Sequence, residues 1–150
     1  MPSHATQSDI AISRLEDQPG IRSLEDFTVR QFWGDWTTTN SATKGIARIK
    51  IAPREGGLVI HAFGASEAAL SDWGETQAEV FVEAGDPSRI RAFRAVYDFG
   101  FLETHLQAKT EKGVLVLASF NRFKDQSGRS NYFSREFFCC ENPPPEIDGW

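Results

Sequence analysis

The chain has 150 residues, of which 40% are apolar and 25% are charged, and its formal net charge is −5. This length suits one domain with a single core, and an acidic chain without a basic cluster does not favour nucleic acid as a partner. Twelve Phe and four Trp against one Met favour the broad interior of a β-sheet structure over a narrow helix seam.

The first twenty residues contain no apolar run behind a basic start, so they do not have the pattern of a secretory signal. Residues 1–22 also lack a hydrophobic period, and we expect a mobile or loosely docked arm that precedes a barrel domain over 23–150. No stretch approaches the roughly 18 consecutive apolar residues of a membrane span. The sequence therefore favours a cytoplasmic location without a membrane role.

A short helical segment is predicted before the first strand. Ser23 can cap a helix, and Glu25 and Asp26 follow it in the first turn. Segment 23–32 is therefore expected to make one or two helical turns that close one end of the fold.

From Trp33 onward, short runs of β-branched and aromatic residues alternate with Gly, Pro, Asp, Asn and Ser. Their connections are too short for parallel crossovers, so successive strands are predicted to be antiparallel neighbours. Closure removes both exposed edges, and we predict an all-β, single up-and-down eight-stranded β-barrel, with a two-sheet sandwich as the alternative. The runs are 33–39, 46–52, 58–64, 75–83, 90–99, 101–109, 114–123 and 131–139.

Two connections, 63–74 and 122–130, are longer than a hairpin requires, and either can shape the mouth of a barrel. Residues 66–71 carry enough Ala and Leu to predict a helical turn. Gly100 lies between two strand-like runs, which predicts a tight reversal or a bulge.

The triplet Gly34-Asp35-Trp36 stands at the start of the first strand of this all-β chain. It resembles the Gly-x-Trp signature of the calycins, the lipocalin and avidin-like barrels. The resemblance implies a short helical segment before the first strand and a Trp packed across the closed barrel end. It also implies a small, mostly apolar ligand inside the barrel.

Strand alternation indicates which side chains share a face. On the third strand His61 shares a face with Val59 and Phe63, which makes it the best candidate for a polar group inside the barrel. Its alternative role is that of a partly buried His bonded to a neighbouring strand. The turn 125–132 is rich in polar groups, and Arg129 could clamp a ligand carboxylate or pair with Asp125.

The fifth and last strands are partly apolar on both faces, which predicts a homodimer contact on their outer side. Three scattered histidines and no Cys-x-x-Cys spacing give no pattern for a metal site. Cys139 and Cys140 are neighbours on opposite faces of a strand and are expected to stay reduced. Neither a phosphate loop nor a nucleophile motif is present, so no cofactor is predicted.

The leading functional prediction is a small-molecule-binding barrel for an apolar or aromatic ligand. The alternative is a cofactor-independent cyclase, isomerase or decarboxylase that uses His61, Glu79 and Tyr97 as acid/base groups. A third reading is a structural barrel filled by its own side chains. The predicted ligand-contacting residues are Trp36, His61, Phe63, Trp73, Phe93, Arg94, Tyr97, Phe120 and Arg129.

Overall fold

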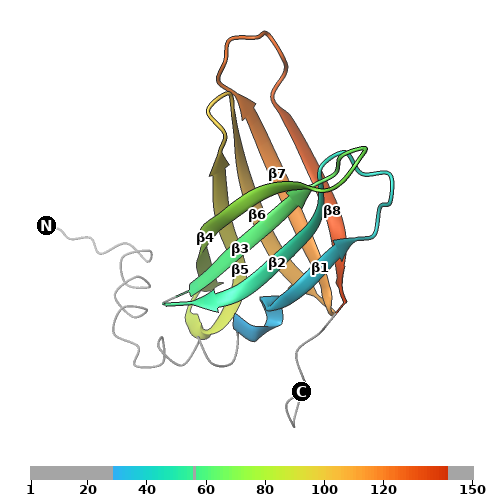
Figure 1. The fold of residues 1–150 in the computed structure, drawn as a ribbon. Coiled ribbons are helices and arrows are strands. Elements are labelled where there is room, and N and C mark those ends of the chain that lie inside the picture. The colour runs from blue at the N-terminus through green and yellow to red at the C-terminus, as the bar shows by residue number, and fades with distance from the viewer. Residues whose placement is uncertain (1–28, 56, 142–150) are drawn as a thin grey trace, which may run out of the picture.

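The structure, a computed structural model, describes residues 29–55 and 57–141. Within them, eight antiparallel strands follow one another around a closed barrel (Figure 1). This confirms the predicted all-β, up-and-down barrel over the sandwich. The arm expected over 1–22 and the start of the predicted helical segment lie outside the described residues. The strands are β1 (Gly34–Thr38), β2 (Ile46–Arg54), β3 (Gly57–Gly64), β4 (Ser71–Glu83), β5 (Asp86–Asp98), β6 (Leu102–Glu111), β7 (Val114–Phe123) and β8 (Tyr132–Cys140).

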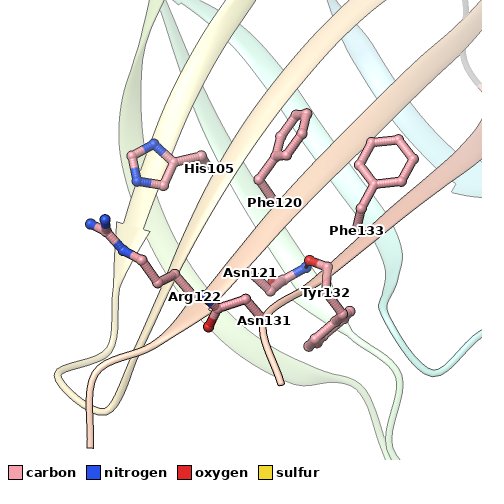
Figure 2. Close-up of a pocket in the computed structure, with 7 residues that line it drawn as sticks. All are labelled: His105, Phe120, Asn121, Arg122, Asn131, Tyr132 and Phe133. Carbon is pink, nitrogen blue, oxygen red and sulfur yellow. Dashed lines mark hydrogen bonds between the residues drawn. The ribbon is translucent and has the colours of Figure 1, made fainter. Parts of the chain in front are cut away.

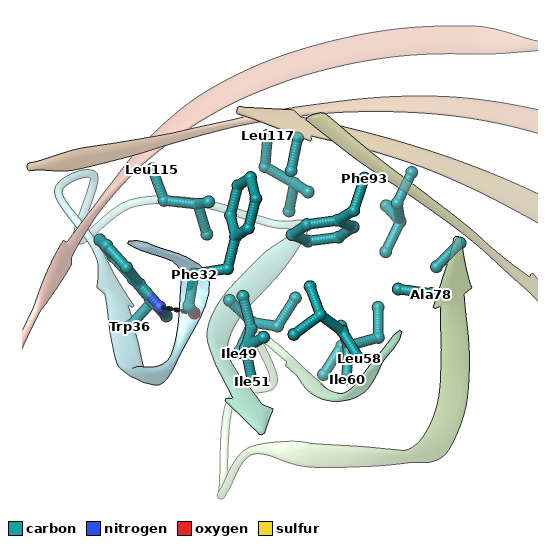
Figure 3. Packing of buried hydrophobic residues seen from close by; sticks show 14 of the residues in the cluster. Phe32, Trp36, Ile49, Ile51, Leu58, Ile60, Ala78, Phe93, Leu115 and Leu117 are labelled. Atoms are coloured by element: carbon teal, nitrogen blue, oxygen red, sulfur yellow. Dashed lines mark hydrogen bonds between the residues drawn. The ribbon is translucent and has the colours of Figure 1, made fainter. Parts of the chain in front are cut away.

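The described part of the helical segment is a single 3-10 turn, η2 (Val29–Phe32), which leads directly into β1. The Trp36 Nε1–H donates a 2.9 Å hydrogen bond to the Phe32 carbonyl, as Figure 3 shows. The Phe32 ring meets the Phe93 ring edge to face at 5.1 Å. Trp36 is 3% exposed, so η2 and Trp36 together close this end of the barrel, as the Gly-x-Trp resemblance implied.

Alternation along each strand separates a packed interior from an outer surface. On β3 the inward residues Leu58, Ile60 and Ala62 have no exposed surface, and they lie opposite inward residues of β2. The largest fully buried side chains come from most of the strands, so the protein's own side chains fill the barrel from η2 through its middle (Figure 3). They are Phe32, Phe93, Phe138, Ile49, Leu58, Ile60, Leu106, Leu115 and Thr104.

Two strands begin earlier than predicted. The predicted helical turn at 66–71 does not form, because the β3–β4 ladder continues past a bulge and Ser71 already pairs with Gly64. Ladder hydrogen bonds outweigh the weak helix preference of a few Ala and Leu. In β5, Asp86 pairs with Glu83, and residues 87–89 form a bulge that tolerates Pro87 without its N–H.

The two ends of the barrel differ in their connections. The closed end has η2 and the tight turns at 84–85 and 112–113. The other end carries the longer loops 39–45, 65–70 and 124–131, together with a reversal at Gly100, where the Phe99 N–H donates to the Leu102 carbonyl at 2.8 Å. This confirms the tight reversal predicted there. Binding residues often lie on long loops of a rigid scaffold, so a site is expected at this second end, here called the open end.

Within the described residues, no helix is long and apolar enough to cross a membrane.

Candidate functional site

A depression with a volume of about 450 Å³ lies at the open end, between loop 39–45 and β8. It forms because β1 ends at Thr38, opposite Phe138, whereas β8 extends to Tyr132 and is paired there with β7 alone. We call it the mouth pocket. Its lining residues are Asn40, Ala42, Thr43, Lys44, Gly45, Tyr132, Ser134 and Glu136.

Loop 39–45 is held by hydrogen bonds from its own polar side chains. Thr38 Oγ1 accepts from the Asn40 N–H at 3.1 Å, and Asn40 Oδ1 accepts from the Ala42 N–H at 3.0 Å. Thr43 Oγ1 accepts from the Gly45 N–H at 3.0 Å. Short polar side chains that bond to backbone two residues later stabilise such turns, so this side of the pocket is preorganised.

Glu136 is the central charged group of the mouth pocket. It shares the inward face of β8 with Ser134 and the fully buried Phe138. The Thr43 hydroxyl donates to Glu136 Oε2 at 2.7 Å, and the Thr38 hydroxyl donates to Oε1 at 3.5 Å. Gly45 makes room for this carboxylate, because a Cβ there would lie 3.1 Å from Oε2.

The Glu136 carboxylate keeps unused hydrogen-bonding capacity. An ionised carboxylate can accept about four hydrogen bonds, and Glu136 receives the two from Thr43 and Thr38. Among the described residues no Lys, Arg or His forms an ion pair with it. An inward, partly buried carboxylate without a cation is suited to receive a donor group from a ligand.

A polar strip continues from the pocket across the inner faces of β8, β7 and β6, near the open end. Ser134 pairs across the ladder with Ser119, and the Thr104 hydroxyl donates to Asn121 Oδ1 at 2.8 Å. Ser119, Asn121 and Thr104 are buried, with exposed fractions of 8%, 6% and 1%. The inner wall of β6 to β8 is thus polar near the open end, whereas the closed end is apolar. No group of three His, Cys, Asp or Glu side chains that could hold a metal ion occurs in the described ranges.

Four of the predicted ligand-contacting residues point inward, but they do not form one binding surface. Trp36, Phe93 and Tyr97 belong to the packed core, and Trp73 packs against it. Trp73 and Tyr97 meet edge to face at 5.4 Å, nearer the open end. The Tyr97 hydroxyl accepts from the Ala62 N–H at 3.0 Å and donates to the Gly74 carbonyl at 2.7 Å. Burial raises the pKa of Tyr97 to about 12, which fits a neutral structural group.

His61 points outward, so the prediction that it lies inside the barrel is wrong. The inward face of β3 belongs to Leu58, Ile60 and Ala62, because these residues pack in the core. The His61 ring stacks on Phe63 at 4.5 Å, and its Nε2 lies 2.5 Å from Asp72 Oδ1. This contact lowers the pKa of Asp72. Phe63 therefore also lies on the outer surface.

Three more predicted residues, Glu79, Arg94 and Phe120, belong to the outer faces of β4, β5 and β7. Arg94 Nη2 donates to Glu79 Oε1 at 2.9 Å, while Phe120 is 44% exposed.

Arg129, also predicted to contact the ligand, lies in loop 124–131. It donates to Asp125 Oδ2 at 2.7 Å, and its guanidinium stacks over the Phe123 ring at 4.2 Å. Hydrogen bonds from Ser127 and Arg129 lower the pKa of Asp125 to about 2. Arg129 thus adopts the pairing that was its alternative role.

A second depression, of about 400 Å³, lies on the outer wall of β6, β7 and β8. Figure 2 shows His105, Phe120 and Phe133 side by side across the three strands, with the Tyr132 ring directed away from them. Glu103 accepts hydrogen bonds here from His105 at 2.6 Å and Arg122 at 2.7 Å, which lower its pKa. Because these charged groups pair with one another, the mouth pocket is the stronger candidate for a ligand site.

No protein-family model, curated protein or solved structure matches this chain. The closed eight-stranded antiparallel barrel is compatible with a calycin-like fold and with small-molecule binding. Function must therefore be inferred from the site itself.

Proposed function

We propose that this chain is a small-molecule-binding barrel whose ligand occupies the mouth pocket and presents a hydrogen-bond donor, such as an amine, to Glu136. The observation that carries this proposal is the inward Glu136 carboxylate, which two threonine hydroxyls orient and with which no described Lys, Arg or His forms an ion pair. Charge-assisted hydrogen bonds are stronger than neutral ones, and a partly water-excluded pocket increases that advantage.

The lining of the pocket also bears on the shape of the ligand. Tyr132 is 51% exposed at the rim and offers a flat apolar surface. Ser134 and Asn40 add hydroxyl and amide groups that can orient a polar end. We therefore propose a ligand with a small aromatic or apolar part and an amine or hydroxyl end. The ligand predicted from sequence would lie deeper, where core side chains already fill the space.

We also propose that the chain is related to the calycins. It is supported by the Trp36 closure of one barrel end and by the open loops at the other. A cytoplasmic location stays a prediction. The enzymatic alternative has no specific observation in its favour, because Tyr97 points inward whereas His61 and Glu79 point outward.

Native mass spectrometry of the gently purified full chain tests the proposal. We expect a reproducible extra mass that is released on denaturation, and its formula identifies the compound for titration. Glu136→Gln preserves shape but removes the charge, so it should weaken binding by about 10- to 100-fold, as expected for a charge-assisted hydrogen bond.

Glu55→Gln is the matched control, because Glu55 is exposed at the closed end of the barrel. This variant should bind the compound as tightly as the wild type. Equal affinity of the Glu136→Gln variant and the wild type for every compound that binds would overturn the proposal.

A further inference from the structure

The exposed apolar side chains of the outer surface are gathered on one side of the barrel, where charged residues such as Arg94, Lys109 and Arg135 lie between them. The outward residues of β1, β2 and β3 include Asp35, Arg48, Lys50 and His61. Most of the described large apolar side chains with substantial exposure lie instead on the outer wall of β4 to β8, here called the outer apolar face; the others lie in loops or at the open rim. The members of this face are Phe81 at 42%, Val96 at 37%, Phe120 at 44%, Phe133 at 56% and Phe137 at 43% exposure.

Register places these residues in two rows across the strands. Val96, His105, Phe120 and Phe133 form the row nearer the open end, and the Phe120 and Phe133 rings lie 5.0 Å apart (Figure 2). Nearer the closed end, Val116 pairs with Phe137, and Phe81 pairs with Ala92. Exposed apolar side chains gathered in this way mark an interaction surface more often than singly scattered ones.

The same face also contains a recess of about 250 Å³. Its lining combines small side chains, among them Ala92 and Ala118, with the long polar side chains of Gln107, Lys109 and Arg135. Protruding phenylalanines and a shallow recess therefore occur on one surface. An isologous interface requires this combination, because each copy must supply both the protrusion and the surface that receives it.

We propose that the outer apolar face binds a second copy of this chain and forms a two-fold symmetric dimer. With the axis along the strands, between β6 and β7, Phe137 comes to lie over the second copy's Ala92, and Phe133 over its Val96. Both contacts place a large β8 ring on a smaller β5 side chain. The inward residue Glu136 faces away from this interface, so the dimer does not depend on the proposed ligand.

The area of the face supports a second copy as its partner. Arg135 lies over the Phe137 ring at 5.7 Å and forms no ion pair with any described carboxylate. The axis places Arg135 over the second copy's Arg94, which already donates to Glu79 Oε1 at 2.9 Å, so Arg135 approaches an ion pair and not an unpaired cation. Strand spacings of about 4.8 Å and residue rises of about 3.3 Å give four ten-residue strands a face of roughly 600 Å². This approaches the roughly 800 Å² that each partner buries in a standard interface.

Analytical ultracentrifugation of the full chain between about 1 and 100 μM tests the proposal. We expect the wild type to sediment at twice the chain mass, and Phe137→Arg at the chain mass, because it places an unpaired charge against the second copy's Ala92 within the contact. Phe133→Ser, a milder change at an exposed ring, should weaken dimerisation at least tenfold. Circular dichroism should show an unchanged β-sheet spectrum for both variants.

Leu70→Arg is the matched control, since Leu70 is 46% exposed but lies in loop 65–70, away from the outer apolar face. It should leave the dimer intact. A monomeric wild type over the whole concentration range would overturn the proposal. So would a dimer that both β8 variants leave unchanged, because a different surface would then hold the two copies together.

Discussion

The Tyr97 hydroxyl ties β3 and β4 together from inside the barrel. It accepts a hydrogen bond from the Ala62 N–H at a bulged position of β3 and donates one to the Gly74 carbonyl of β4. Ala62 has no exposed surface, so no water can take the place of this hydroxyl. Trp73 and Phe99 pack against the Tyr97 ring at 5.4 and 5.8 Å, which holds it in position.

Replacing Tyr97 with Phe should destabilise the protein at neutral pH. The buried Ala62 N–H loses its acceptor, and an unsatisfied buried donor costs about 1–3 kcal/mol. Urea unfolding at fixed protein concentration measures this loss. Tyr132→Phe is the control and should change the free energy of unfolding by less than about 0.5 kcal/mol, because Tyr132 is half exposed.

The same hydroxyl predicts a pH dependence. Burial raises the pKa of folded Tyr97 to about 12, above its ordinary value of 10.0. Its stabilisation is complete below pH 10 and falls as the pH rises to 12, because only the unfolded state then releases the proton. The stability difference between wild type and Tyr97→Phe should therefore narrow by about 2–3 kcal/mol over this window. A constant difference would contradict a buried neutral hydroxyl.

At the scale of elements, the β6–β7 hairpin shows how local sequence sets a connection. Its two turn residues, Lys112 and Gly113, have φ values of 51° and 83°. Positive φ at both central residues is the pattern of a type I′ turn, whose twist matches that of the flanking strands. Gly suits the second position, whereas Lys pays a steric cost at the first.

Two substitutions in this turn should act in opposite directions. Lys112→Asn should raise the free energy of unfolding by about 0.5 kcal/mol, because Asn tolerates positive φ better than Lys. Gly113→Ala should lower it by about 1 kcal/mol, because a Cβ is strained at this φ. Urea unfolding measures both. A destabilised Lys112→Asn variant would show that the turn has another geometry.

Strand number, order and closure could be predicted because they depend on local alternation and short connections. The inward face of β3 could not be predicted, because Leu58, Ile60 and Ala62 are as apolar as Val59 and Phe63 on the opposite face. Only the pairing with β2 and β4 decides between them. A one-residue bulge exchanges the two faces, and the bulges in β3–β4 and β4–β5 leave no clear signal in the sequence.

At the scale of the whole molecule, the mouth pocket depends on residues far apart in the chain. Glu136 meets Thr43 only because β8 pairs with β1 to close the barrel. Alternation on the last strand could have indicated Glu136, which shares a face with Phe138 and Cys140. Its partners in loop 39–45 could not have been inferred, because no local pattern reports which loop lies beside which strand end.

The barrel as a whole combines a closed end, an open end and the outer apolar face. Core side chains and η2 fill the closed end, so they stabilise the scaffold and leave little space there for a ligand. The open end carries the inward polar strip and the mouth pocket. Binding inside the open end and self-association on the outer wall therefore use opposite faces of β8, and each can be tested without the other.

The most direct test of ligand binding at the open end is a backbone amide NMR titration of the full chain with the compound that native mass spectrometry identifies. We predict saturable shifts concentrated at residues 40–45 and 132–136, with the closed-end residues Phe32 and Trp36 unaffected. Shifts concentrated at the closed end or on the outer apolar face, with none in the mouth pocket, would contradict this assignment.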